Sequence, residues 1–217
     1  WQCGAVAGFP GTIIMNQQQF QKAAGISVGL AARWFKPVTA AMSEFGITAV
    51  NDQAMFIAQA GHESDGFSAV SESFNYAPAV LLTTFGSRIT NQQAYALGRS
   101  NGKPAQQQAI ANLVYYNRMG NKAAGDGWKY HGRGPIQITG LDNYRKCGAG
   151  LKLDLVTNPE LLEQDINGAR SAAWFFSSEG CMLYSGDIER VTLIINGGKN
   201  GLDDRKKRYS TALAALA

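Results

Sequence analysis

Two glutamates near the end of one predicted helix are the first candidates for chemistry. Glu63 closes an apolar stretch, and Glu72 follows nine positions later, beyond a loop of small residues. Two carboxyl groups across a cleft can hydrolyse a glycosidic bond: one donates a proton to the leaving oxygen, and the other activates water or attacks carbon. The spacing alone also fits two surface glutamates, because acidic side chains are mostly exposed.

The sequence around each glutamate favours a different role. Residues 55–58 are apolar, and burial beside them would raise the pKa of Glu63 and keep a proton available. Glu72 lies among serine and asparagine side chains, where we expect it to stay ionised. Residues 73–76 follow it with aromatic and amide groups suited to a sugar, Tyr76 among them. These neighbourhoods favour Glu63 as the acid and Glu72 as the base.

A glycine-rich segment over residues 130–140 is the second candidate. Its glycines let backbone approach a ligand closely. The alternation over residues 136–139 predicts a short strand with Gln137 and Thr139 on one face, so that both side chains point at one ligand. A phosphate-binding loop is excluded, because neither G-x-G-x-x-G nor a following Lys-Ser/Thr pair is present. A tight structural turn remains the alternative.

Two features near the C-terminus complete the set. A helix ends at Asn196 with two glycines after it, which an ordinary helix C-cap also explains. Residues 205–208 are all basic, and we expect them to form a solvated helix face that attracts anionic envelopes.

The elements that must position these residues are mostly helical. We expect a mainly α single catalytic domain over residues 15–217, with a small lobe at about 84–124 and at most a short β-hairpin. Residues 64–83 are expected to be loop, residues 120–135 cannot form a helix, and residues 1–14 are interpreted as an upstream or artificial extension. Capping residues and glycine stops predict helices over residues 16–24, 27–35, 37–45, 51–63, 91–97, 105–118, 158–178, 187–196 and 203–217.

Composition excludes several classes of protein. The chain has 217 residues, a net charge of +4, 45% hydrophobic and 17% charged residues, which rules out wholesale disorder. No apolar run is long enough for stable membrane insertion, and no basic patch interleaved with aromatics suggests nucleic acid. No metal or cofactor is expected, since Gly66 replaces the second histidine of the HExxH motif. Cys3, Cys147 and Cys181 are interpreted as free thiols, with a Cys147–Cys181 bridge as the alternative.

Four segments together carry a family resemblance. His62-Glu63-Ser64, the GRGPIQIT segment at 132–139, Asn143-Tyr144 and the INGG segment at 195–198 resemble glycoside hydrolase family 19 in order and spacing. The bacteriophage endolysin branch is the most similar, and the resemblance runs from about Met15 to the C-terminus. It implies a lysozyme-like, mainly α fold with a cleft between a large lobe and a small helical lobe.

The resemblance also implies residue roles. Glu63 matches the general acid, Glu72 the general base, and Thr139 a residue that helps to hold the attacking water. The chain departs from many chitinases at Asn200, where they have an acid, and in the short loop before Glu72. The remaining positions expected at the substrate site are Gln137, Asn143 and Asn196 against N-acetylated sugar, Tyr76 as a stacking group, and Arg205 as an electrostatic support of the acid.

The expected function is that of an endolysin: cleavage of β-1,4 bonds between N-acetylated amino sugars of bacterial peptidoglycan, with inversion, for host-cell lysis. The connection between the glutamates leaves room for the roughly 6.5–9.5 Å gap of an inverting enzyme. The protein is expected to be a monomer, to stay in the host cytoplasm without an export signal, and to reach the cell wall through a holin lesion. The alternatives are a chitinase, a lytic transglycosylase with one catalytic glutamate, and a non-catalytic cell-wall glycan-binding domain.

Overall fold

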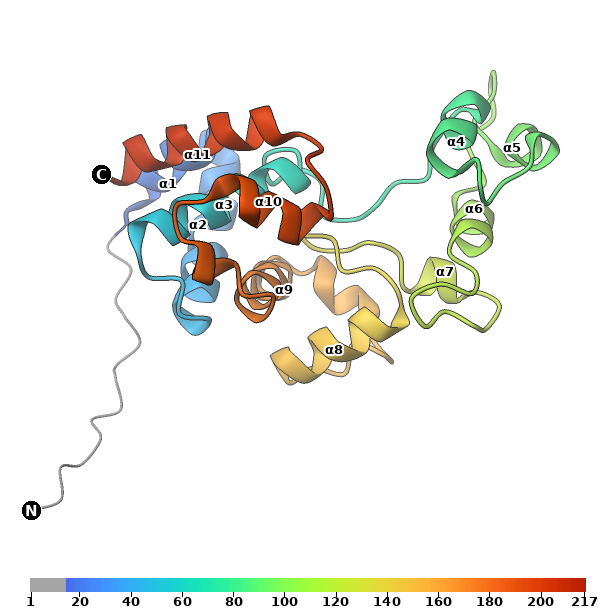
Figure 1. The fold of residues 1–217 in the computed structure, drawn as a ribbon. Coiled ribbons are helices and arrows are strands. Elements are labelled where there is room, and N and C mark those ends of the chain that lie inside the picture. Colours follow the sequence, from blue (N-terminus) through green and yellow to red (C-terminus); the bar gives the residue numbers. More distant parts are fainter. Residues whose placement is uncertain (1–14) are drawn as a thin grey trace, which may run out of the picture.

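The computed structural model describes residues 15–217 and gathers them into a larger and a smaller group of helices (Figure 1). The prediction for residues 1–14 lies outside this range. The predicted mainly α fold is confirmed: within the described residues, β structure is limited to isolated bridges. No helix in this part of the chain is long and apolar enough to cross a bilayer.

The larger lobe surrounds one central helix, α3 (Val50–Glu63). Every residue from 52 to 61 on this helix is buried, so the helix is enclosed around its whole circumference. Trp34, Phe56 and Phe176 are among the large side chains of the core. The helices around α3 are α1 (Gln17–Ala24), α2 (Val28–Glu44), α9 (Asp165–Ser178), α10 (Ile188–Asn196) and α11 (Leu202–Leu216).

The smaller lobe has a hydrophobic core of its own. Phe74, Leu81, Ile110 and Val114 are fully buried in it, and Trp128 packs against its edge. Two of its helices correct the sequence expectations, since residues 78–83 were expected to be loop and residues 126–129 lie in a segment expected not to form a helix. Pro78 starts the first of them at a position where its missing N–H costs nothing. The helices of this lobe are α4 (Pro78–Phe85), α5 (Asn91–Leu97), α6 (Gln107–Val114) and α7 (Asp126–Lys129).

A third cluster of buried residues forms around α8 (Leu141–Leu151) and the 3-10 helix η1 (Pro159–Glu163). Cys147 lies in this cluster, and Cys181 begins the 3-10 helix η2 (Cys181–Tyr184). Both are free thiols, so the alternative of a disulfide between them is wrong. Burial raises the pKa of each thiol to about 12, which makes them unreactive.

Helix boundaries differ from the prediction where packing outweighs local preference. Two helices were predicted on either side of Pro37, but α2 runs through it, because Trp34 and Val38 bury one continuous face across the proline. Conversely, residues 158–178 are divided into η1 and α9. The last helix begins after Gly201, with Asp203 in its first turn instead of at the cap.

The glycine-rich segment forms a tight turn and not the predicted strand. Arg133 and Ile138 close the turn through paired backbone hydrogen bonds of 3.2 and 2.9 Å. The Tyr144 hydroxyl of α8 donates to the His131 carbonyl at 2.7 Å and accepts from the Arg133 guanidinium at 3.0 Å. Arg133 also pairs with Glu163 at 2.7 Å. A buried tyrosine and a largely buried arginine therefore fix the turn against α8 and η1.

Replacing Tyr144 by Phe tests this support. The change leaves a buried carbonyl without its donor, and we expect the free energy of unfolding to fall by about 1–3 kcal/mol. Urea denaturation measures the loss. Tyr95→Phe is the matched control, because Tyr95 is 71% exposed and its hydroxyl should contribute almost nothing. An unchanged midpoint for Tyr144→Phe would contradict the role given to this hydroxyl.

Candidate active site

Glu63 is the last residue of α3, and its carboxylate is held by an arginine from α11. The Arg205 guanidinium donates to Glu63 Oε1 at 2.5 Å. The Glu63 side chain is 24% exposed, whereas Arg205 is 1% exposed. Among the described residues, no hydrogen bond engages Glu63 Oε2, so that oxygen is available to a ligand.

Arg205 is satisfied by three acceptors, two on α3 and one just before α11. Besides Glu63, its guanidinium donates to the Gln59 side-chain oxygen and, at 3.1 Å, to the Asn200 carbonyl. Gln59 in turn donates to the buried Thr192 hydroxyl at 2.9 Å. A buried cation needs such partners, because an unpaired charge is very unfavourable away from water. Glu63 is the only carboxylate paired with Arg205 among residues 15–217.

This burial corrects the expectation that residues 205–208 form one solvated face. The run 205–208 is not a uniform solvated face: Lys206 and Lys207 are exposed, but Arg205 points into the core. A side chain at 1% exposure cannot contact a polysaccharide directly. Arg205 is therefore a positioning residue that acts through Glu63.

A second contact between α3 and α11 lies beside the first, and sequence reasoning missed it. His62 Nδ1 lies 2.7 Å from Asp204 Oδ2, which also accepts from Arg208 at 2.7 Å. Gly201 packs directly against the His62 ring, where a Cβ would collide with it. The adjacency of His62 to Glu63 and of Asp204 to Arg205 was the signal available in the sequence.

Glu72 is held by the glycine-rich turn and by the small lobe. Its backbone N–H donates to the Gly132 carbonyl at 2.8 Å, and the Gly132 N–H donates back to Glu72 Oε2 at 3.1 Å. The Tyr115 hydroxyl, just after α6, donates to Glu72 Oε1 at 2.8 Å. Each carboxylate oxygen thus has one donor. Tyr115 lies outside every motif found in the sequence, so its contact with Glu72 was not predicted.

The electrostatics of Glu72 also differ from the expectation. Burial raises the pKa of Glu72, and the hydrogen bonds from Tyr115 and Gly132 oppose that rise. The serines beside it in sequence do not solvate it enough to prevent this. The charge of Glu72 in turn contributes to raising the pKa of both Tyr76 and Tyr115, after the larger effect of burial. Tyr76 therefore lies within electrostatic reach of Glu72, as does Tyr115.

Gln137, predicted to bind sugar, and Thr139, predicted to hold the attacking water, converge beside Gly132. A Cβ on Gly132 would lie 2.5 Å from Gln137 Oε1 and 3.1 Å from Thr139 Oγ1, so both side chains face this glycine. The Asn143 amide donates to the Thr139 carbonyl at 2.8 Å. Although the predicted strand is absent from this described segment, the turn brings Gln137 and Thr139 to one place, next to the glycine that holds Glu72.

No hydrogen bond among the described residues links the Asn196 side chain to this group. Asn196 is exposed at the C-terminal end of α10, where Gly197 adopts the left-handed conformation with a φ of 73°. In Figure 1, α3 and α10 lie together in the large lobe, whereas the extended segment after α3 leads across to α4 in the small lobe. Glu63 thus ends a large-lobe helix, and Glu72 lies on the connection between the lobes.

This arrangement suits acid–base chemistry. One partly exposed carboxyl has a buried cation behind it, which stabilises the negative charge left when a proton is donated. The other has a raised pKa, two fixed donors, and a threonine hydroxyl and a glutamine amide nearby. Within residues 15–217, no group of three His, Cys, Asp or Glu side chains could hold a metal ion.

Comparison with known proteins gives the family. The family model for glycoside hydrolase family 19, described as chitinase class I, matches residues 30–183. A glycosyl hydrolase family 19 domain-containing protein of Haemophilus influenzae is 38% identical over 179 residues, which are 81% of this chain and 85% of that protein. Endochitinase B of Nicotiana tabacum is 32% identical over 124 residues, 57% of this chain but only 31% of that longer protein.

Solved structures agree on the fold. Chitinase C from Streptomyces griseus superposes with a TM-score of 0.61 at 17% identity, over 98% of this chain and 95% of that one. At this identity the similarity concerns the fold alone, and it confirms the predicted lysozyme-like architecture. With the match of the family model and the Haemophilus influenzae relative, the chain belongs to glycoside hydrolase family 19 and is a glycoside hydrolase.

Proposed function

We propose that this glycoside hydrolase is an endolysin that cleaves β-1,4 bonds between N-acetylated amino sugars of bacterial peptidoglycan, with inversion, during host-cell lysis. The observation that carries the catalytic part is the different support of two carboxyl groups. Arg205 holds one oxygen of Glu63, whereas Tyr115 and the Gly132 amide hold both oxygens of Glu72. Such a pair is what a proton donor and a water-activating base require.

In this mechanism Glu63 protonates the leaving oxygen through Oε2, and Arg205 stabilises the carboxylate that results. Glu72 removes a proton from water, which attacks the anomeric carbon from the opposite face. The Thr139 hydroxyl orients that water. No covalent glycosyl-enzyme forms, so the configuration at the anomeric carbon inverts.

The sugar is held by side chains around the base. Gln137 and Asn143 supply amides for the acetamido and hydroxyl groups of the substrate, Tyr76 supplies an aromatic face, and Asn196 acts from the end of α10. These residues would grip an N-acetylated glycan in either peptidoglycan or chitin, so they do not decide between the two polymers.

Charge supports peptidoglycan as the substrate. Peptidoglycan bears acidic peptide stems, whereas chitin is neutral, and the chain has a net charge of +4 with exposed Lys206 and Lys207. Action as a monomer, residence in the host cytoplasm before lysis, and release to the wall by a holin are parts of the same proposal. A chitinase is the second candidate, because Nicotiana tabacum Endochitinase B is among the relatives. A purely glycan-binding domain would not need two separately supported carboxyl groups.

Hydrolysis of bacterial cell walls tests the substrate. We expect the turbidity of outer-membrane-permeabilised bacteria to fall. We also expect mass spectrometry of the released fragments to show free reducing ends. Fragments that end in a 1,6-anhydro sugar would identify a transglycosylase. Cleavage of chitin oligomers with no cleavage of peptidoglycan would favour the chitinase.

Glu63→Gln tests the acid. The amide keeps the shape and an oxygen for Arg205 but has no transferable proton, so we expect cell-wall hydrolysis to fall by about 10²–10⁴-fold. Initial rates of reducing-end release measure the effect. Glu160→Gln, at an exposed position, is the matched control. Thermal melting of both variants separates a catalytic loss from unfolding, and a folded Glu63→Gln protein with more than about a tenth of the activity would contradict the assignment.

Tyr115→Phe tests the base. The hydroxyl donates to the charged form of Glu72, so its removal should raise the pKa of Glu72 further. Because a base must be ionised, activity is lost as the pH falls through this pKa. We therefore expect the acidic limb of the kcat/KM profile to move to higher pH in Tyr115→Phe, but not in the control Tyr95→Phe. A limb that stays in place would show that another group sets it.

A further inference from the structure

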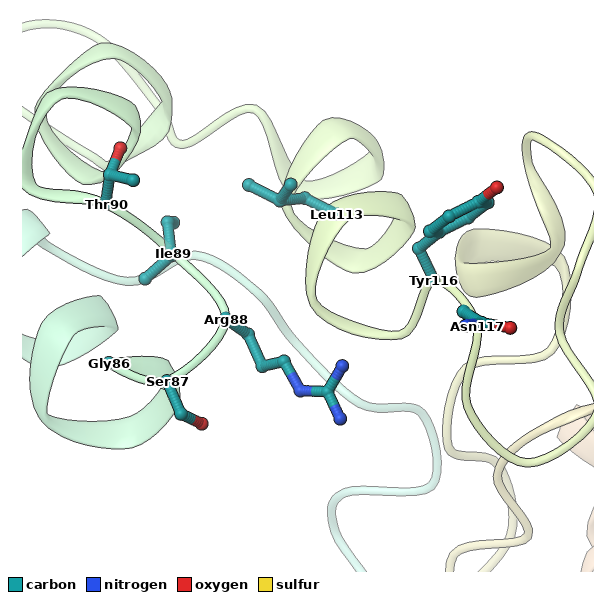
Figure 2. Close-up of a pocket in the computed structure, with 8 residues that line it drawn as sticks. All are labelled: Gly86, Ser87, Arg88, Ile89, Thr90, Leu113, Tyr116 and Asn117. Atoms are coloured by element: carbon teal, nitrogen blue, oxygen red, sulfur yellow. The ribbon is translucent and has the colours of Figure 1, made fainter.

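The small lobe contains a pocket whose function the catalytic mechanism does not explain. It has a volume of about 470 Å³ and lies between the α4–α5 connection and the end of α6. In Figure 2, the Arg88 side chain extends from the connection toward the end of α6, where Tyr116 and Asn117 project. The pocket is lined by Gly86, Ser87, Arg88, Ile89, Thr90, Leu113, Tyr116 and Asn117.

This pocket is lined by an arginine with no ion-pair partner among the described residues. Arg88 is exposed and makes no ion pair with a side chain of residues 15–217. The same holds for Arg118, which is two residues beyond Tyr116 and exposed. In contrast, Arg33, Arg133, Arg145 and Arg170 each pair with a carboxylate. Arg88 thus has its guanidinium available for an anion.

The chain connects this pocket directly to the catalytic base. Tyr115 donates to Glu72, and the next residue, Tyr116, is 56% exposed at the pocket. Consecutive Cα atoms are only about 3.8 Å apart, so the backbone that positions Tyr115 also positions Tyr116. The positive charge of Arg118 also lowers the pKa of Tyr115, which places that cation near the same segment. The pocket is thus lined by a residue adjacent in sequence to the one that donates to Glu72.

We propose that this pocket binds the acidic peptide stems of peptidoglycan, with the Arg88 guanidinium contacting a stem carboxylate. The inference rests on the proposed function and specifies what separates peptidoglycan from chitin for this chain. The pocket is a specificity site for the same substrate and takes no part in bond cleavage.

The chemistry of the lining fits a peptide better than a bare sugar. A guanidinium matches a carboxylate in a two-pronged arrangement, which a neutral sugar cannot offer. Ser87 and Asn117 supply hydroxyl and amide groups for peptide bonds, and Leu113 supplies an apolar surface for short aliphatic side chains. A stem peptide presents all three kinds of group, whereas chitin presents no charge.

The test compares two forms of one substrate. Purified glycan strands freed of teichoic acid carry either native stem carboxylates or the same carboxylates converted to amides, so that charge is the difference. For wild-type protein we expect a lower KM on the acidic strands. For Arg88→Gln we expect that preference to fall about tenfold, as for loss of one charge-assisted hydrogen bond. Arg88→Lys should retain part of it.

Lys103→Gln is the matched control, because it removes one exposed positive charge in the same lobe outside the pocket. It should keep the wild-type preference. Two results would overturn the proposal. In the first, Arg88→Gln and Lys103→Gln show the same preference for acidic over amidated strands. In the second, Arg88→Gln weakens the action on acidic and on amidated strands by the same factor. The first result would indicate general electrostatic attraction, and the second a neutral sugar subsite.

A binding measurement separates this proposal from the proposed function. Isothermal titration of the free acidic stem peptide and of its amidated form needs no hydrolysis. If the acidic peptide binds and its binding weakens in Arg88→Gln, the pocket assignment is supported, even if the wild-type protein does not cleave peptidoglycan. A lack of cleavage would overturn the endolysin assignment alone. Equal binding of both peptides would overturn the pocket assignment alone.

Discussion

The buried guanidinium of Arg205 is the constraint on which the large lobe and its carboxylate depend. A cation at 1% exposure must have acceptors, and they come from the side chains of Gln59 and Glu63 on α3 and from the carbonyl of Asn200 before α11. Removal of one partner from such a pair leaves an uncompensated charge, which typically costs about 3–5 kcal/mol. The geometry of Glu63 is thus a consequence of how two helices satisfy one side chain.

Glu72 is held differently, since no ion pair with a residue of the described range 15–217 engages it. Its carboxylate is fixed by a backbone amide and a phenol, and the Gly132 turn that supplies the amide is itself fixed by Tyr144 and Arg133. Burial of a carboxylate with neutral donors raises its pKa, whereas an arginine partner stabilises charge. Two glutamates nine residues apart therefore have different electrostatic environments, because different parts of the fold hold them. An arginine of α11 holds Glu63, whereas Tyr115 and the Gly132 turn hold Glu72.

Much of the fold could be predicted from sequence because the signals were local. Asn16 caps α1 and Asp187 caps α10, where the sequence predicts the starts of these helices. Predictions failed where a distant contact decides the outcome. Helix α2 continues through Pro37 because both sides pack on the same core.

The same distinction applies to the site. The sequence predicted that Gln137 and Thr139 lie together, but it predicted a strand as the reason. The residues form a turn, and this turn also brings the two side chains together. The burial of Arg205 within a basic run and the hydrogen bond from Tyr115 depend on neighbours far away in the chain, 142 and 43 residues from their partner glutamates. Periodicity over a few residues does not report such contacts.

The central claim is that a water molecule held between the sugar and Glu72 attacks the anomeric carbon while Glu63 protonates the leaving group. Proton NMR of the anomeric signals, recorded in the first minutes of hydrolysis by the wild-type protein, tests it most directly, because mutarotation has not yet mixed the products. The account predicts that the new reducing end appears first as the α-anomer. A β-anomer as the first product would mean that the carboxylate attacks carbon itself or that retention occurs by another route, and it would contradict the roles given to Glu72 and Thr139.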